Sequence, residues 1–240
     1  MADKKTIAIF GAGTGLGASL ATRFGHEGYR VALVARRPEP LDARVAELAR
    51  AGIEAVAFPA DLTNIARIPA LVRSIEERLG AIDVAIYQPV GHIGFVSAVE
   101  LDAAKLEPLA SIFAFSPIEV SHAVLPGMLA RGNGAIVIVG GLTAVVPMPG
   151  LSGVGPMMAA ARNYIFTLNA EVASKGVYAG TVNIGAVIDR SAGLRIMTSG
   201  GVPLDPRYPI LNPDDIAEEI WTRVTKRDQV EAILPPLPQA

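Results

Sequence analysis

The sequence predicts a single α/β domain in which a doubly wound, seven-stranded parallel sheet carries helices on both faces. Three observations predict this fold class. Apolar runs alternate with helical patterns along all 240 residues. The first apolar run ends in a glycine-rich turn that opens a helix. The runs are also continuously apolar, which is typical of parallel strands covered on both faces. Because we find neither an internal repeat nor a linker, we expect residues 1–240 to form one domain.

The elements follow one another in regular βα order. Glycines such as Gly52 and Gly80 directly follow helical patterns, as expected at helix ends. Strands are expected at residues 7–10, 30–35, 53–58, 83–87, 135–140, 177–184 and 230–234. Helices are expected at residues 18–26, 41–51, 65–79, 102–131 with an interruption near Pro117, 152–174 and 213–226. The loosest stretch, residues 189–212, is expected over the carboxyl ends of the strands, where ligands bind in such sheets.

Composition excludes several classes of function. A chain with 51% hydrophobic and 18% charged residues is too apolar for disorder, and a net charge of −2 provides no basic stripe for nucleic acid. Without cysteine and with three scattered histidines, we expect no disulfide framework, no thiolate nucleophile and no metal site. The short polar start and the absence of an apolar run approaching 18 residues predict no membrane partner and a cytoplasmic location.

The first strand runs into glycines with the spacing G-x-x-x-G-x-G. Glycine has no Cβ, so it tolerates positive φ and lets backbone N–H groups and a helix N-terminus approach a diphosphate closely. The position between an N-terminal strand and a helix is the context that dinucleotide binding requires. Tight packing alone is the alternative interpretation. The cofactor contacts predicted from this turn are Gly11, Thr14, Gly15, Leu16 and Gly17.

Two further segments bear on the nucleotide. Arg36 and Arg37 follow the second strand, where an acidic residue would favour NAD(H) and a cation suits a 2′-phosphate, so NADP(H) is expected in preference to NAD(H). The alternative is a pair of solvated loop charges. Asp61 and Leu62 follow the third strand and are expected at the adenine edge, with the carboxylate of Asp61 and the amide of Leu62 as contacts. Asp61 could instead cap the following helix.

With these motifs in order, the chain resembles the short-chain dehydrogenase/reductase family over nearly its whole length. The matching segments are residues 11–17 for the family's TGxxxGxG, 61–63 for its adenine-contacting Asp motif, and 125–128, 134–137, 175–177 and 183–185. The resemblance implies a Rossmann-type fold with strand order 3-2-1-4-5-6-7 and an NAD(P)-dependent oxidoreductase activity. It also implies a homodimer or homotetramer packed through the two long helices.

The family's four catalytic residues do not match this chain. The resemblance implies a Tyr whose pKa is lowered by a Lys four residues later, a Ser that holds the carbonyl oxygen and an Asn that positions a water. The Tyr position falls on Val154, the Lys position on Met158, the Ser position on Gly141 and the Asn position near Phe113. The tyrosine on this helix, Tyr164, lies ten residues beyond the expected place, or about 15 Å along an α-helix.

Three interpretations stay open at this point. In the first, the chain is a divergent oxidoreductase that acts on a small apolar substrate and takes its proton from another group. In the second, it is a catalytically inactive protein that binds NADP(H), either as a sensor or as the silent partner of an active relative. In the third, it is a structural protein that binds no cofactor. Residues 145–149 and 194–197 favour an apolar ligand. Alternative proton donors would come from segments bordering the cleft, with two to be tested first, Tyr87 and His92, followed by Gln88, Thr143 and Ser152.

Overall fold

The computed structural model describes residues 4–90, 96–199 and 209–237. Within these ranges the main sheet has seven parallel strands in the order β3-β2-β1-β4-β5-β6-β9. The order equals 3-2-1-4-5-6-7 when the strands of this sheet alone are counted, which confirms the predicted fold class. The strands are β1 (Thr6–Phe10), β2 (Arg30–Ala35), β3 (Ala55–Pro59), β4 (Ile82–Tyr87), β5 (Gly134–Gly141), β6 (Val177–Ile184) and β9 (Glu231–Leu234).

The sheet is buried on both faces because its strands are apolar on both. All five residues of the interior strand β1 are buried. Alternate side chains point to opposite faces, so Ile7 and Ile9 join one core cluster while Ala8 and Phe10 join the other. Ile9 pairs with Leu33 of β2 and with Ile86 of β4, so the first predicted strand lies inside the sheet with a neighbour on each side.

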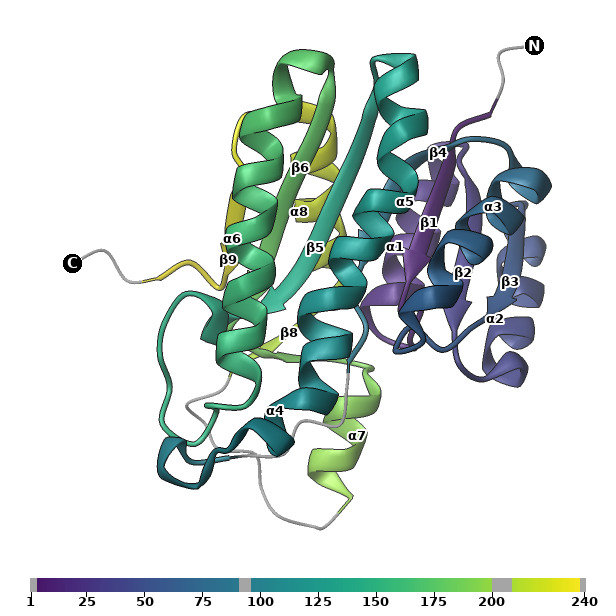
Figure 1. Cartoon of the computed structure of the whole chain (residues 1–240). Helices are drawn as coiled ribbons and strands as arrows, with labels where there is room; N and C mark the ends of the chain where they lie inside the picture. The colour runs from purple at the N-terminus through teal and green to yellow at the C-terminus, as the bar shows by residue number, and fades with distance from the viewer. Residues whose placement is uncertain (1–3, 91–95, 200–208, 238–240) are drawn as a thin grey trace.

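Helices cover each face in a separate layer (Figure 1). The layer on one side consists of α3 (Ile68–Leu79), α5 (Ser116–Arg131) and α6 (Val154–Val172). The opposite layer consists of α1 (Leu16–His26), α2 (Pro38–Arg50) and α8 (Pro213–Lys226). Each helix lies within a few residues of the range predicted from the sequence, and the differences fall at helix ends, where propensity is least decisive.

The long pattern at residues 102–131 forms two helices joined by a π-helical turn. These are α4 (Ala103–Ala110), the turn Ser111–Phe115 and α5. The predicted interruption near Pro117 is therefore present, but it precedes the proline, which occupies the start of α5 where a missing N–H is tolerated. The hydroxyl of Tyr87 donates to the carbonyl of Ile112 inside this turn, at 2.5 Å.

The same run, Ala103–Arg131, has the length and composition of a membrane span, with a mean hydropathy of 1.3. Part of its apolar surface is used within the protein, since Val120, Val124 and Met128 of α5 are buried in the core between helix layer and sheet. The core helix of a globular protein can have the same length and hydropathy, and we interpret this run as such a helix.

Smaller elements gather at the carboxyl edge of the sheet (Figure 1). The short helix α7 (Ala192–Thr198) and the two-stranded pair β7 (Val187–Ile188) and β8 (Ile210–Leu211) lie there together with α4. The predicted loose stretch thus begins and ends in ordered elements at the edge where the glycine-rich turn lies. Residues 200–208 of that stretch lie outside the described ranges.

Candidate functional site

The glycine-rich turn has a backbone that side chains would obstruct. Gly11 has φ +96°, and a Cβ there would lie 2.5 Å from the nitrogen of Pro89. A Cβ on Gly17 would lie 2.8 Å from Cα of Ala12. Helix α1 begins directly after Gly15, which provides no side-chain cap, so the N–H groups of the first turn are not satisfied by a capping side chain. This geometry fits a bound phosphate.

Gln88 supports the turn from β4. Its backbone N–H donates to the carbonyl of Phe10 at 2.8 Å, and its side-chain Nε2 donates to the carbonyl of Gly11 at 2.8 Å. The side chain is buried, and Nε2 lies 2.8 Å from the place that a Cβ on Gly17 would take. Sequence reasoning considered Gln88 only as a proton donor. A polar residue at the end of a buried central strand was the available signal for this supporting role.

The chain beyond β6 folds over the turn. Thr14 is exposed and donates to the carbonyl of Arg190 at 3.1 Å, while Arg195 of α7 donates to the hydroxyl of Thr14 at 2.9 Å. Gly15 is buried by the same segment, because a Cβ there would lie 3.1 Å from Cβ of Ser191. Leu16 points its side chain into the core. Of the predicted turn residues, Thr14 thus offers its side chain at the surface.

The predicted nucleotide residues surround the carboxyl ends of β2 and β3. Arg36 and Arg37 are exposed, and Arg37 occupies the residue before α2. Asp61 accepts hydrogen bonds from the backbone N–H and the hydroxyl of Thr63, at 3.0 and 2.8 Å, and these bonds lower the pKa of Asp61, with a smaller contribution from the positive charge of Arg36. Asp61 therefore closes a local turn with Thr63 and does not cap the following helix, whose N-cap is Arg67, and it presents its charge beside Arg36. The side chain of Leu62 is in the core and its carbonyl accepts from the hydroxyl of Ser116, so its backbone N–H is the group left for the predicted contact with adenine.

The four positions that we aligned with the family's catalytic residues carry no acidic, basic or hydroxyl side chain. Gly141 ends β5, Val154 and Met158 lie in the first turns of α6, and Phe113 lies in the π-helical turn. The N–H of Gly141 donates to Sδ of Met158 at 3.3 Å, and the hydroxyl of Thr143 lies 3.8 Å from the same sulfur. Val154 is buried, as is Phe113 in the π-helical turn. Thioether sulfur is a weak acceptor. Two donors therefore converge on a group that satisfies them poorly.

A small cavity of about 10 Å³ lies behind Met158, between α6 and strands β5 and β6. Asn183 lines it, donates to Glu231 through Nδ2 at 2.8 Å, and leaves its buried Oδ1 without a hydrogen-bond partner. Arg162 lines it from α6 and forms a two-pronged pair with Glu231 at 2.5 and 2.7 Å. The volume is about that of one water molecule, which would satisfy the oxygen of Asn183.

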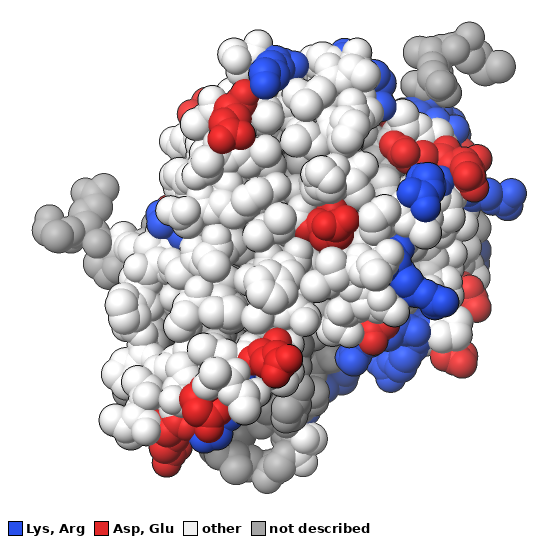
Figure 2. Space-filling view, viewed as in Figure 1, with Lys and Arg blue, Asp and Glu red and all other residues white. Residues whose placement is uncertain are grey.

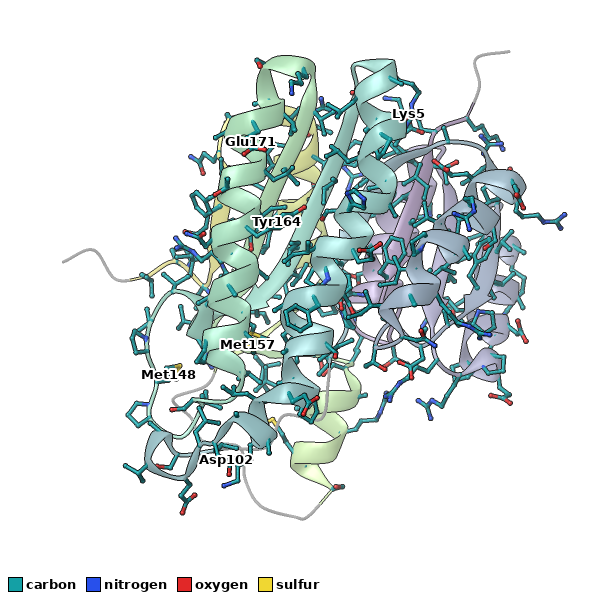
Figure 3. All side chains as sticks on the ribbon, in the orientation of Figure 1. Lys5, Asp102, Met148, Met157, Tyr164 and Glu171 are labelled. Carbon is teal, nitrogen blue, oxygen red and sulfur yellow. The ribbon has the colours of Figure 1, made fainter. Side chains whose placement is uncertain are left out.

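The other candidate donors differ in their surroundings. Tyr87 is buried and its hydroxyl donates a hydrogen bond to the carbonyl of Ile112. Burial raises the pKa of Tyr87 well above the usual range of a phenol. We infer that Tyr87 holds the π-helical turn and is a poor proton donor. Ser152 lies half-buried in the turn before α6, and its N–H donates to Val96 at 3.1 Å. His92 lies outside the described residues. Tyr164 packs against the core midway along α6, well beyond Met157 near the start of that helix (Figure 3).

The outer face of α5 and α6 carries few charges. Figure 2 shows this face as mostly uncharged, with isolated acidic side chains. Phe115 is 54% exposed and Phe166 is 36% exposed, whereas Phe113 and Ile165 are buried in the chain's own core. Tyr164 and Ile112 are half-buried against that core. Of the apolar residues from which we expected self-association, two phenylalanines thus remain well exposed.

Comparisons with known proteins agree with this architecture. A family model described as short chain dehydrogenase matches residues 5–192. The 2-(S)-hydroxypropyl-CoM dehydrogenase 3 of Xanthobacter autotrophicus is 30% identical over 224 residues, which cover 90% of this chain and 88% of that protein. The 2,3-dihydro-2,3-dihydroxybenzoate dehydrogenase of Bacillus subtilis is 30% identical over 185 residues, 77% of this chain and 70% of that one.

Solved structures share the fold at lower identity. A metagenomic short-chain oxidoreductase in complex with NADP superposes with a TM-score of 0.80 at 24% identity, covering 98% of both chains. L-Sorbose reductase from Gluconobacter frateurii, complexed with NADPH and L-sorbose, superposes with a TM-score of 0.81 at 20% identity, covering 97% of this chain and 95% of that one. At this level of identity the structural likeness concerns the fold alone.

Proposed function

Because the chain belongs to the short chain dehydrogenase family, we propose that it is an NADP(H)-dependent oxidoreductase that acts on a small apolar substrate without a phenolic proton donor. The observation that carries this proposal is the contrast between the two halves of the site. The turn from Gly11 to Gly17 is closely packed and leaves the N–H groups at the start of α1 without a capping side chain, as a diphosphate site needs. By contrast, Val154 and Met158 put apolar side chains where the resemblance to the family places the proton donor.

The nucleotide half supports NADP(H) in particular. Arg36 lies exposed at the end of β2, beside Asp61, and can offer a bidentate guanidinium to a 2′-phosphate. Arg37 is exposed next to it at the start of α2. When bound, the cofactor supplies a hydride. Relatives solved with NADP and NADPH are consistent with this choice.

The reacting half supports a substrate that needs little help from an acid. The N–H of Gly141 and the hydroxyl of Thr143 both point at Sδ of Met158. Because the sulfur is a weak acceptor on a flexible side chain, a substrate oxygen can take its place and accept both bonds. Such donors stabilise negative charge on oxygen without transferring a proton.

An activated alkene conjugated to a carbonyl meets these conditions. Hydride adds to the β-carbon, the electron pair moves to the carbonyl oxygen, and the resulting enolate accepts hydrogen bonds from Gly141 and Thr143 before water protonates the α-carbon. An unactivated ketone would instead give an alkoxide, which is far more basic and needs an acid beside it. The proposed substrate class is therefore small apolar enones.

The test is NADPH oxidation by the purified protein against matched enones and ketones, with quinones and imines alongside. We expect turnover of enones and little or none of simple ketones. Thr143→Val should lower kcat/KM for the enone about 100-fold, as expected for loss of one donor to a developing oxyanion, whereas Thr143→Ser should retain most activity. Thr143→Val should leave the affinity for NADPH unchanged, which separates chemistry from binding.

Two results would contradict the proposal. Robust turnover of a simple ketone would mean that another residue donates the proton, with Tyr87 and His92 the first to be replaced. Tight NADPH binding with no turnover of any substrate class would instead favour the inactive sensor or silent partner.

A further inference from the structure

Arg195 brings a guanidinium to the glycine-rich turn from a distant part of the chain. It lies on α7, 181 residues after Thr14, and its Nη2 donates to the Thr14 hydroxyl at 2.9 Å. That hydroxyl in turn donates to the carbonyl of Arg190 at 3.1 Å. Thr14 lies in the exposed part of the turn, just before the start of α1. The positive charge of Arg195 is thus held beside the helix end at which a phosphate would bind.

The neighbouring charges are engaged elsewhere. Arg190 donates to Asp214 and to Asn212, each at 2.7 Å. Asp214 also accepts from the hydroxyl of Ser19 at 2.6 Å. The bond from Ser19 lowers the pKa of Asp214 most, and the bond from Arg190 lowers it further. The carboxylate of Asp189 accepts from the backbone N–H of Arg190 at 2.7 Å. The guanidinium of Arg190 is therefore committed to its acidic neighbour, while that of Arg195 is bonded to a neutral hydroxyl.

The bond to Thr14 leaves Arg195 with donors to spare. A guanidinium carries five N–H donors in a planar fork and accepts no hydrogen bond. An exposed bond from an arginine to a hydroxyl contributes little stability, so it can be exchanged readily for a stronger partner. A phosphate oxygen is such a partner, because charge-assisted bonds are roughly twice as strong as neutral ones.

Resting on the proposed function, we propose that Arg195 is a ligand of the cofactor's diphosphate, contributed by α7 across the glycine-rich turn. Thr14 holds the guanidinium at the turn before the cofactor arrives. The N–H groups at the start of α1 and the guanidinium of Arg195 would then hold the diphosphate together. Since both nicotinamide cofactors contain this diphosphate, Arg195 adds affinity for each equally, whereas Arg36 distinguishes them.

The experiment compares Arg195→Gln and Arg36→Gln, with Arg50→Gln as control. Arg50 is an exposed arginine at the end of α2 that donates to a carbonyl of its own helix, so the control makes the same charge change away from the turn. Dissociation constants are measured by calorimetry and cofactor fluorescence for NADPH and NADH. Adenosine 2′-monophosphate serves as a third ligand, because it carries the 2′-phosphate and lacks the diphosphate.

We expect Arg195→Gln to weaken NADPH and NADH alike, by about 10- to 100-fold, and to leave adenosine 2′-monophosphate unchanged. Arg36→Gln should show the opposite profile, weakening NADPH and adenosine 2′-monophosphate but not NADH. Arg50→Gln should match the wild type.

Wild-type affinities for both dinucleotides in Arg195→Gln would overturn the assignment while leaving the proposed function intact. An equal loss for all three ligands would also overturn it, since that pattern indicates a disturbed fold. Failure of the wild-type protein to bind either dinucleotide would overturn both the assignment and the proposed function.

Discussion

Two glycines of the same turn differ in what a methyl group would meet, and this difference makes a sharp prediction. A Cβ on Gly17 would lie 2.8 Å from Cα and 2.9 Å from the carbonyl carbon of Ala12. Backbone atoms cannot move aside as a side chain can, and favourable contacts between carbons begin at about 3.5 Å. A Cβ on Gly13 would meet only the carbonyl oxygen of Gly11, at 3.9 Å.

The expected magnitudes have opposite signs. In Gly17→Ala, overpacking costs about 1–3 kcal/mol or more and is offset by about 1 kcal/mol of helix propensity, so we expect a loss of stability of up to about 2 kcal/mol. Gly13→Ala restricts the unfolded chain without a clash and should be neutral or add up to about 1 kcal/mol. For a chain of this length, each 1 kcal/mol shifts Tm by about 2–4 °C.

Thermal unfolding of the cofactor-free variants measures both effects. We expect Gly17→Ala to melt up to about 8 °C below the wild type and to bind NADPH more weakly, because the turn must open to admit the methyl group. Gly13→Ala should melt at or above the wild-type temperature. If Gly17→Ala matched the wild type, or if Gly13→Ala were the more damaging change, the turn would not have the close packing described above.

Three further predictions concern other parts of the molecule. Arg36→Asp should weaken NADPH by more than about 10-fold and leave NADH within a few-fold of wild type, since it replaces a charge-assisted contact with repulsion of the 2′-phosphate; equal losses for the two cofactors in a fluorescence titration would argue against it. Tyr87→Phe should lower the free energy of unfolding in urea by about 1–3 kcal/mol, because the carbonyl of Ile112 loses its buried partner, while NADPH affinity stays the same; an unchanged unfolding free energy would remove that role. Light scattering should return a dimer or tetramer of the 25.0 kDa chain that dissociates when Phe115 and Phe166 are both changed to Glu; a mass of one chain at micromolar concentration would contradict self-association through α5 and α6.

Local patterns were sufficient to predict the sheet and the turn. The strands are continuous apolar runs, and Gly11, Gly15 and Gly17 have a spacing whose steric reason the structure makes plain. The interruption of the 102–131 helix was also predicted, because Pro117 cannot continue a hydrogen-bond ladder. Its π-helical form was not, and neither was the bond to the carbonyl of Ile112 in this turn, which comes from Tyr87 of another element.

Contacts between distant segments escaped prediction for the same reason. Nothing in the sequence around Arg195 indicates that its guanidinium lies on Thr14, because the contact requires α7 to fold over the first βα turn. The bond from Gln88 to Gly11 depends on two strands that are neighbours only in the sheet. Alignment placed Met158 at a catalytic position, but the convergence of two donors on its sulfur is visible only in three dimensions.

The most direct measurement of the central claim is a fluorescence titration of the unmodified protein with NADPH and with NADH. We expect saturable binding of both, with NADPH bound about 10- to 100-fold more tightly because of Arg36. Equal dissociation constants would contradict the proposed preference, and no binding of either cofactor would contradict the proposal that this turn holds a dinucleotide.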